Sequence, residues 1–147
     1  MTTGYALGPN EGEHLVLRGG SIVIKSDPTR GSNGITMLTQ QVLAGVGIPI
    51  HRHLQMDEAF YVLEGAGTVV LDNARHPIEK RGTIFIPRNT WHGFENAHHE
   101  LVLLATIVPT GLEGFFREIA SPPGVGEKTL SKQQLNEIGR KYGQEFM

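Results

Sequence analysis

The sequence contains no cysteine, no excess of basic residues and no long hydrophobic run. Without cysteine, the chain cannot form a disulfide, use a thiolate nucleophile or hold zinc through sulfur. Its net charge is −2, so it lacks the basic surface that binding of nucleic acid requires. The longest apolar run, around Leu101–Val108, is much shorter than the ~20 residues of a membrane-spanning helix. We therefore expect neither nucleic acid nor a membrane as a partner.

The first five residues, Met-Thr-Thr-Gly-Tyr, have neither the basic start nor the apolar core of a secretion signal. Together with the absence of cysteine, this leads us to expect a cytoplasmic protein. A chain of 147 residues suits one domain with its own core. Its 19 glycines and 19% charged residues are typical of a β protein rich in turns.

Short β-type segments separated by turn-forming residues follow one another through most of the chain. No helical pattern lies between them, so neighbouring strands should be antiparallel. About ten such strands imply a closed barrel or a double sheet. The last strand, 101–109, is apolar throughout, and we expect it to be buried on both faces. The predicted strands are 14–18, 21–25, 35–43, 48–53, 58–64, 68–71, 75–80, 83–87, a short one from His92, and 101–109.

After residue 109 the pattern changes to that of helices. Ser131, with Gln134 three residues later, forms a capping box that should start a second helix, and Gly143 should end it. The first helix is predicted from apolar residues on one face. They are Leu112, Phe115, Phe116 and Ile119. We interpret the Phe pair as core rather than as a lid or a cofactor-binding element.

Two histidines near the middle of the chain have the spacing of a metal site. His51 and His53 are two residues apart, so an extended strand would direct both imidazoles to one face. Neutral imidazole is a common ligand of transition metals. Glu58 follows His53 at an odd spacing, so it would point to the opposite face of an unbroken strand. A turn over 54–57 would let the next strand present Glu58 to the same point.

A second segment supplies a third imidazole. His92 follows a predicted strand and a Pro-Arg-Asn-Thr turn. Three histidines and one glutamate would bind one divalent transition metal and leave room for water or substrate. The predicted ligands are His51, His53, Glu58 and His92. These ligand types suit Fe, Mn, Ni, Cu, Co or Zn, and the sequence does not select one.

The two segments resemble the two sequence motifs of the cupin superfamily. The first motif has Gly, five residues, His-x-His, three or four residues, Glu, six residues and Gly. It is matched at every position by Gly45, His51, His53, Glu58 and Gly65. The second motif has Gly, five residues, Pro-x-Gly, two residues, His, three residues and Asn. It is matched by Gly82, Pro87, His92 and Asn96.

The second motif departs from the family pattern twice. Only four residues separate Gly82 from Pro87, which would shorten a loop or remove a bulge. Asn89 stands where the family has Gly. This change is mild, because Asn tolerates a left-handed backbone better than most residues.

The resemblance implies an all-β fold, a small cupin β-barrel or jelly roll (double-stranded β-helix), with short C-terminal helices. Residues 1–13 would form an N-terminal arm, 14–110 the barrel, and 111–147 a C-terminal helical extension packed on the barrel. The chain is similar to single-domain cupins described as quercetin-dioxygenase-like.

The family is usually homodimeric. The outward-facing Ala59, Tyr61 and Leu63 would suit a sheet face buried between two subunits, although C-terminal helices of the same chain could cover it instead.

The neighbours of the predicted ligands suggest an apolar cavity. Alternation along the strands places Phe60, Val62 and Phe94 on the metal side, and the same parity places Asn96 there. Such a cavity suits a small aromatic or enol-type ligand. Glu58 would serve either as a ligand only or as a catalytic base that takes a proton from the substrate.

Three functions fit this site. The first is a metal-dependent, dioxygenase-like enzyme that cleaves a small organic substrate oxidatively. The second is an isomerase or lyase acting on a sugar or keto acid, and the third is a cupin that binds a small ligand without turnover. Two residues near His92 have ordinary interpretations: Trp91 should point away from the metal, and Arg88 should lie in an exposed loop.

Overall fold

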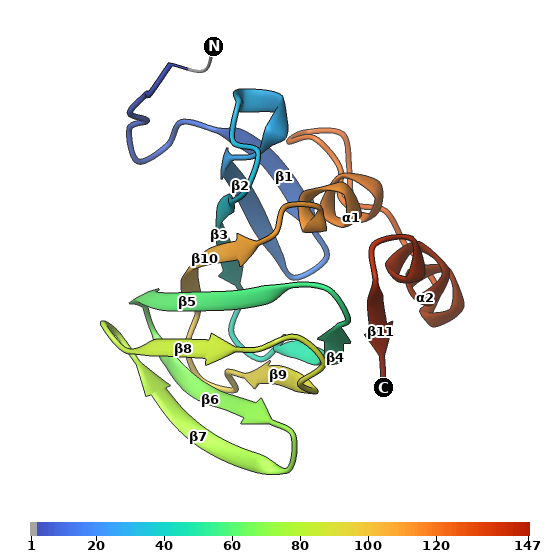
Figure 1. Cartoon of the computed structure of the whole chain (residues 1–147). Coiled ribbons are helices and arrows are strands. Elements are labelled where there is room, and N and C mark those ends of the chain that lie inside the picture. Colours follow the sequence, from blue (N-terminus) through green and yellow to red (C-terminus); the bar gives the residue numbers. More distant parts are fainter. Residues whose placement is uncertain (1–2) are drawn as a thin grey trace.

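The structure is a computed structural model that describes residues 3–147, so the first two residues of the predicted N-terminal arm lie outside the described part. Eleven strands in this part of the chain form two antiparallel sheets (Figure 1). The six-stranded sheet has the order β1 (Glu13–Leu17), β2 (Gly20–Ser26), β3 (Thr36–Val42), β10 (Leu101–Val108), β5 (Asp57–Glu64) and β8 (Thr83–Ile86). The five-stranded sheet has the order β11 (Gln144–Phe146), β4 (Ile48–His53), β9 (His92–Glu95), β6 (Ala66–Leu71) and β7 (Ala74–Glu79). The predicted all-β, jelly-roll architecture is confirmed.

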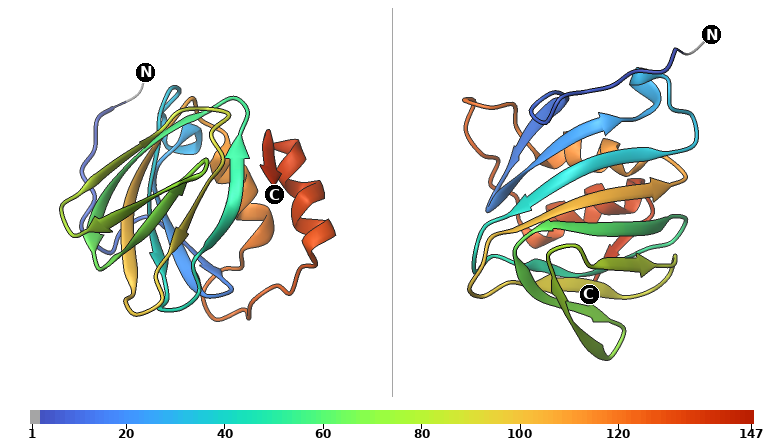
Figure 2. Two further views of the ribbon diagram at one scale, coloured as in Figure 1. Left: turned by 90° about the horizontal axis from the view of Figure 1, so that it is seen from below. Right: turned by 90° about the vertical axis from the view of Figure 1, so that its left-hand side faces the viewer.

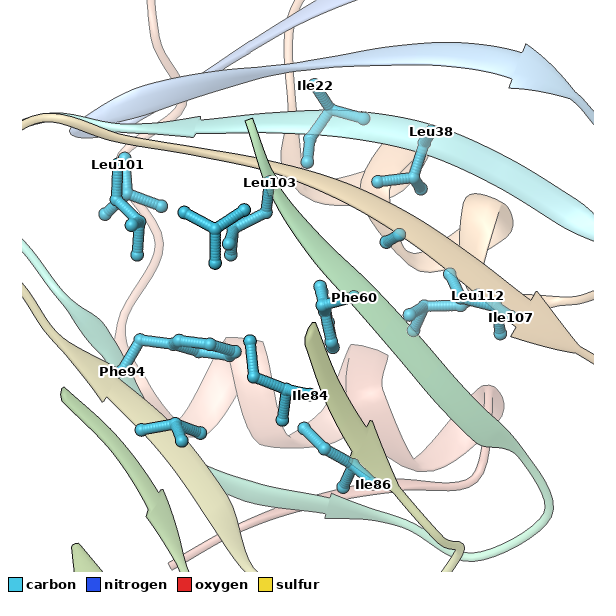
Figure 3. Close-up of a cluster of buried hydrophobic side chains, with 14 of the residues drawn as sticks. Ile22, Leu38, Phe60, Ile84, Ile86, Phe94, Leu101, Leu103, Ile107 and Leu112 are labelled. Carbon is cyan, nitrogen blue, oxygen red and sulfur yellow. The ribbon is translucent and has the colours of Figure 1, made fainter. Parts of the chain in front are cut away.

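The hydrophobic core lies between the two sheets, where Phe60 of β5 and Phe94 of β9 approach each other (Figure 3). Strand β10 contributes Leu101, Leu103 and other alternate residues to this core. The intervening residues of β10 are only half-buried, and Val108 is exposed. The prediction that this strand is buried on both faces is therefore wrong, because residues 3–147 leave its outer face partly exposed.

Strands β4 and β5 are consecutive but belong to different sheets. The turn between His53 and Asp57 therefore carries the chain across the barrel instead of forming a hairpin. Since the inner faces of the two sheets oppose each other, Glu58 at the start of β5 can face the histidines of β4. This crossing removes the parity conflict between His53 and Glu58.

The departures in the second motif leave the local pairing intact. Strand β8 pairs with β5 in a continuous register from Ile86, opposite Glu58, to Thr83, opposite Tyr61. Asn89 has φ +69°, the left-handed conformation that favours Gly or Asn. Gly65 of the first motif also has a positive φ, and an added Cβ would lie 2.0 Å from the carbonyl oxygen of Glu100. Both positions therefore have backbone reasons for their residues.

The C-terminal segment contains helices α1 (Leu112–Ile119) and α2 (Lys132–Lys141), and Ser131 forms the predicted capping box with Gln134. Both helices lie on the side of the barrel where β4 runs (Figure 2). The prediction of a purely helical extension is incomplete, because strand β11 follows α2 and pairs with β4. Three residues are too few for a strand pattern to be recognised. No helix in the described chain has the length and apolar character needed to cross a membrane.

Helix α1 is tied to the N-terminal strands by ionic contacts of Arg117. Its guanidinium donates to Glu13 at 2.7 Å and to Asp27 at 2.8 Å. The Asp27 side chain is fully buried. Burial acts to raise the pKa of Asp27, but hydrogen bonds from Thr29 and Arg117 outweigh it and hold this pKa below its usual value. Asp27 is thus ionised in the folded protein and depends on Arg117 for its counter-charge.

We expect Arg117→Met to lower the free energy of unfolding at pH 7 by about 2–4 kcal/mol, because it leaves the Asp27 carboxylate buried without its cation. Because the pKa of Asp27 is lowered in the folded protein, its ionisation stabilises the fold at pH values above the unfolded-state pKa of about 3.9. This stabilisation is lost as the pH falls below that value. Urea unfolding should therefore show that the free energy of unfolding falls less between roughly pH 5 and pH 3 in the variant than in wild type. Arg140→Met, at an exposed position of α2, is the control; equal stability of both variants would contradict the assignment.

Candidate metal centre

Three histidines from two neighbouring strands meet inside the barrel. His51 and His53 lie on the inner face of β4, and His92 opens β9 directly opposite His51. All three are buried, and their candidate ligand atoms lie within 4.8 Å of one another. The three histidines are therefore positioned to bind a metal.

Glu58 reaches the same point from the opposite sheet. Its side chain is 5% exposed, and its Oε2 lies 3.1 Å from Nε2 of His92 and 3.4 Å from Nε2 of His53. The structure thus brings together all four side chains that the two motifs single out.

Main-chain carbonyls orient two of the three imidazoles. Nδ1 of His51 donates to the carbonyl oxygen of Pro49 at 2.7 Å, and Nδ1 of His92 donates to that of Thr90 at 2.9 Å. Because a carbonyl only accepts, each Nδ1 must carry the proton. A neutral ring then has its lone pair on Nε2, which is the arrangement that a metal ligand needs.

The buried atoms at the centre of the cluster require a cation. Nε2 of His53, Nε2 of His92 and Oε2 of Glu58 are buried and have no hydrogen-bond partner within residues 3–147. With the imidazole protons on Nδ1, as metal ligation requires, the Nε2 lone pairs would face the Glu58 carboxylate at 3.1–3.4 Å and repel it. A divalent transition metal would satisfy all of them, so the donor set fits such an ion.

The protonation states favour this role. Burial, and next the neighbouring His92 and His53, lower the pKa of His51 to about 3. His51 is consequently a neutral ligand at pH 7. For Glu58, burial acts to raise the pKa, but hydrogen-bonding and charge interactions with His53 and His92 outweigh it and hold the pKa well below its usual range. These interactions need a proton or another cation between each Nε2 and the carboxylate, and a bound metal would supply that charge. Glu58 is consequently ionised.

A cavity of about 620 Å³ opens from the histidine cluster. Phe60 and Phe94 line it as predicted, with their ring centroids 5.3 Å apart. Val62 is not among its lining residues and is fully buried in the core. It occupies the inner face of β5, but two residues further from Glu58 than Phe60, where the two sheets pack together.

The C-terminal segment closes one side of this cavity. Leu112, Phe115, Phe116 and Ile119 of α1 line it, together with Gln144 and Phe146 of β11. The Phe115 ring lies 6.1 Å from that of Phe146, which in turn lies 5.8 Å from His51. Sequence reasoning identified the α1 residues only as core and missed β11, whose short sequence carries no periodic signal.

Three other residues in the segment of the second motif lie outside the cavity. Asn96 does not share the metal side as parity suggested, because β9 ends at Glu95. Its Nδ2 donates to the carbonyls of Val42, Leu43 and His99, and its Oδ1 accepts from the N–H of Gly47. Trp91 stacks under the guanidinium of Arg52, 4.6 Å from the ring centroid. Arg88 is exposed and pairs with Asp57 at 3.1 Å.

The fold and the cluster together define a small two-sheet β-barrel with a buried group of histidines. Residues 38–108 match the family model described as a cupin domain. This part of the chain is a cupin domain.

Several known proteins match this chain over different lengths. The chain is 31% identical over 83 residues to an uncharacterized protein of Methanocaldococcus jannaschii, and this alignment covers 55% of this chain and 66% of that protein. It is 25% identical over 118 residues to quercetin 2,3-dioxygenase of Bacillus subtilis, and this alignment covers 80% of this chain but only 35% of that enzyme. The structure of KdgF from Halomonas sp. superposes with a TM-score of 0.66 at 19% identity, covering 74% of this chain and 96% of that one. These likenesses define the fold, while the chain spans less than two thirds of the two relatives it matches by sequence.

We expect the purified protein to bind one divalent transition metal, and His92→Ala to weaken this binding at least 100-fold because it removes one of three imidazoles at the centre. Metal content after dialysis and competition titration with a chromophoric chelator measure both. A metal present at 100 times its Kd should also add about 2.7 kcal/mol to the stability of wild type.

The matched control is His98→Ala, which removes an exposed histidine. Wild-type affinity in His92→Ala, or an equal loss in His98→Ala, would contradict the assignment of the centre.

Proposed function

We propose that the protein is a metal-dependent, dioxygenase-like enzyme that acts on a small aromatic or enol-type substrate. The observation that carries this proposal is the junction of a buried three-histidine cluster and an ionised glutamate with an apolar cavity. The histidines and Glu58 line one part of the cavity, aromatic side chains form much of its wall, and Arg18, Gln40 and Lys128 also line it. A substrate with a flat apolar body and a polar, chelating edge matches this arrangement.

The ligand set divides the chemistry between the ion and the protein. His51, His53 and His92 would hold the metal, with Glu58 beside them. When bound, the ion would supply Lewis acidity and, if redox-active, the electron transfer that O₂-dependent cleavage requires. The protein supplies the position of the substrate and the path of its proton.

Glu58 is the group placed to accept that proton. Its carboxylate is ionised and buried, and its Oε2 has no hydrogen-bond partner in the described chain. A substrate hydroxyl bound beside the histidines would lie within reach of this oxygen and could transfer its proton to it. The resulting enolate or phenolate is a better chelator and is more easily oxidised than the neutral substrate.

The aromatic walls position the substrate and exclude water. Phe60 and Phe94 come from the two opposed sheets, and Phe115 and Phe116 come from α1. The volume of about 620 Å³ lies in the range of small-molecule sites. The similarity to quercetin 2,3-dioxygenase extends over 80% of this chain and supports a hydroxylated aromatic substrate.

O₂ uptake tests this proposal directly. Metal-loaded protein screened against small phenols, flavonols and diketones should consume O₂ with at least one of them, and Glu58→Gln should lower kcat by a factor on the order of 10²–10⁴, because the amide cannot accept the proton. Metal content of the variant is the control, since three histidines remain to hold the ion.

Turnover of sugars or keto acids without O₂ uptake would favour the isomerase or lyase reading instead. Ligand binding with no product would favour a binding protein. Unchanged kcat in a metal-loaded Glu58→Gln variant would remove Glu58 from the chemistry.

We also propose that two copies associate through the outer face of the six-stranded sheet. Side chains of β5, β8 and β10 form an uncharged patch there, which we call the outer patch: Ala59, Tyr61, Thr83, Phe85, Leu104 and Thr106. Phe85 is 63% exposed and Tyr61 is 38% exposed. Because no member is charged, the patch can face its own copy about a two-fold axis without repulsion.

Wild type should therefore sediment with about twice the 16.1 kDa mass of one chain, and Phe85→Glu should sediment as a monomer, because each copy would place a carboxylate in the apolar contact. Val125→Glu, at an apolar residue that is 70% exposed and lies outside the outer patch, is the control. A monomeric wild type at all concentrations would refute this interface.

A further inference from the structure

Strand β11 places one polar side chain directly beside the histidine cluster. Gln144 pairs with His53 across the β11–β4 ladder, and Phe146 pairs with His51. Two further main-chain hydrogen bonds fix this register, from Leu54 N–H to the Gly143 carbonyl at 2.8 Å and from Met147 N–H to the Ile50 carbonyl at 3.0 Å. Residues directly opposite in an antiparallel pair project to the same face with their Cβ atoms about 5 Å apart. The side chain of Gln144 is thus a neighbour of the His53 imidazole.

Both side chains carry a buried polar atom without a partner. Gln144 is 4% exposed and His53 is 2% exposed. Oε1 of Gln144 and Nδ1 of His53 are among the buried atoms that have no hydrogen bond in the described chain. Leaving such a buried group without a hydrogen bond is unfavourable. Oε1 of Gln144 is an amide oxygen that can accept a hydrogen bond, and Nδ1 of His53 is a ring nitrogen on the neighbouring strand.

His53 differs in this respect from the other two histidines. His51 and His92 each donate Nδ1–H to a main-chain carbonyl, whereas Nδ1 of His53 has no acceptor among residues 3–147. Nε2 of His53 faces Glu58 at 3.4 Å. If Nε2 is to bind a metal, the proton of the neutral ring must lie on Nδ1, which then needs an acceptor.

We propose that Gln144 is a positioning residue of the metal centre: in the metal-loaded protein, its Oε1 accepts the hydrogen bond from Nδ1–H of His53. The bond requires the side chain of Gln144 to rotate about its own torsions, with the backbone of β11 in place. The bond fixes the His53 tautomer and the orientation of its ring, as the carbonyls of Pro49 and Thr90 do for the other two. The inference rests on the metal centre of the proposed function and adds the C-terminal strand to it.

The packing around β11 supports this role. Phe146 lies against His51 and Phe115, so it packs the strand against both the cluster and α1. Gly139 of α2 packs against Gln144 so closely that an added Cβ would lie 3.0 Å from the carbonyl oxygen of Gln144. Glu145, between the two inward residues, points outward and binds Arg52 at 2.7 Å.

Metal affinity separates this role from a merely structural one. Competition titration with Zn(II) should show binding 10–100-fold weaker in Gln144→Leu, which keeps the size of the side chain but removes the acceptor. Gln144→Glu should restore binding to within a few-fold of wild type, because a carboxylate accepts the same bond. Glu145→Gln, on the same strand but facing outward, should bind zinc like wild type.

Nitrogen-15 NMR of the zinc-loaded protein gives an independent readout. Wild type and Gln144→Glu should show His53 with its proton on Nδ1 and protected from exchange, and Gln144→Leu should lose that protection. Wild-type zinc affinity in Gln144→Leu would overturn the proposal, as would a loss that Gln144→Glu does not restore. Failure of wild type itself to bind a transition metal would overturn the metal-dependent function as well, so the two failures are distinguishable.

Discussion

The structure depends on one electrostatic constraint: several lone pairs meet at a buried point between two sheets. His53, His92 and Glu58 place acceptor atoms 3.1–3.4 Å apart, where water cannot screen them. Such an arrangement is unfavourable unless a cation sits among them. The main-chain carbonyls of Pro49 and Thr90 reinforce it, because they hold the protons of two imidazoles on the far side of each ring.

The fold meets this constraint by drawing its ligands from both sheets. Strands β4 and β9 are neighbours, so His51 and His92 lie opposite each other, and the register shift between Ile48 and His51 adjusts that alignment. Glu58 arrives from β5 because the chain crosses the barrel after His53. Asn96 then ties the end of β9 to the loops at Val42 and Gly47, which fixes the strand that carries His92. The last residue of the second motif therefore acts through the backbone and not at the metal.

Local patterns in the sequence predicted most of this arrangement. The His-x-His spacing, the strand alternation around Phe60 and Phe94, and the capping box at Ser131 each depend on residues close together in the chain, so a linear sequence carries them. What it could not supply was which surfaces meet. Three features depend on contacts that form only in the folded chain. They are the exposure of the outer face of β10, the burial of Val62 in the core and the pairing of β11 with β4. Gln144 was missed for the same reason, since its importance comes entirely from lying beside His53.

Strand β11 lies both at the edge of its sheet and beside the histidine cluster. This strand of three residues lies at the edge of its sheet and lines the cavity through Gln144 and Phe146. Edge strands of this length generally open at lower free energy than central strands. Yet the same strand contacts the two histidines of β4. The side chains that line the cavity here are therefore also neighbours of His51 and His53. This edge of the five-stranded sheet belongs both to the cavity wall and to the surroundings of the histidines.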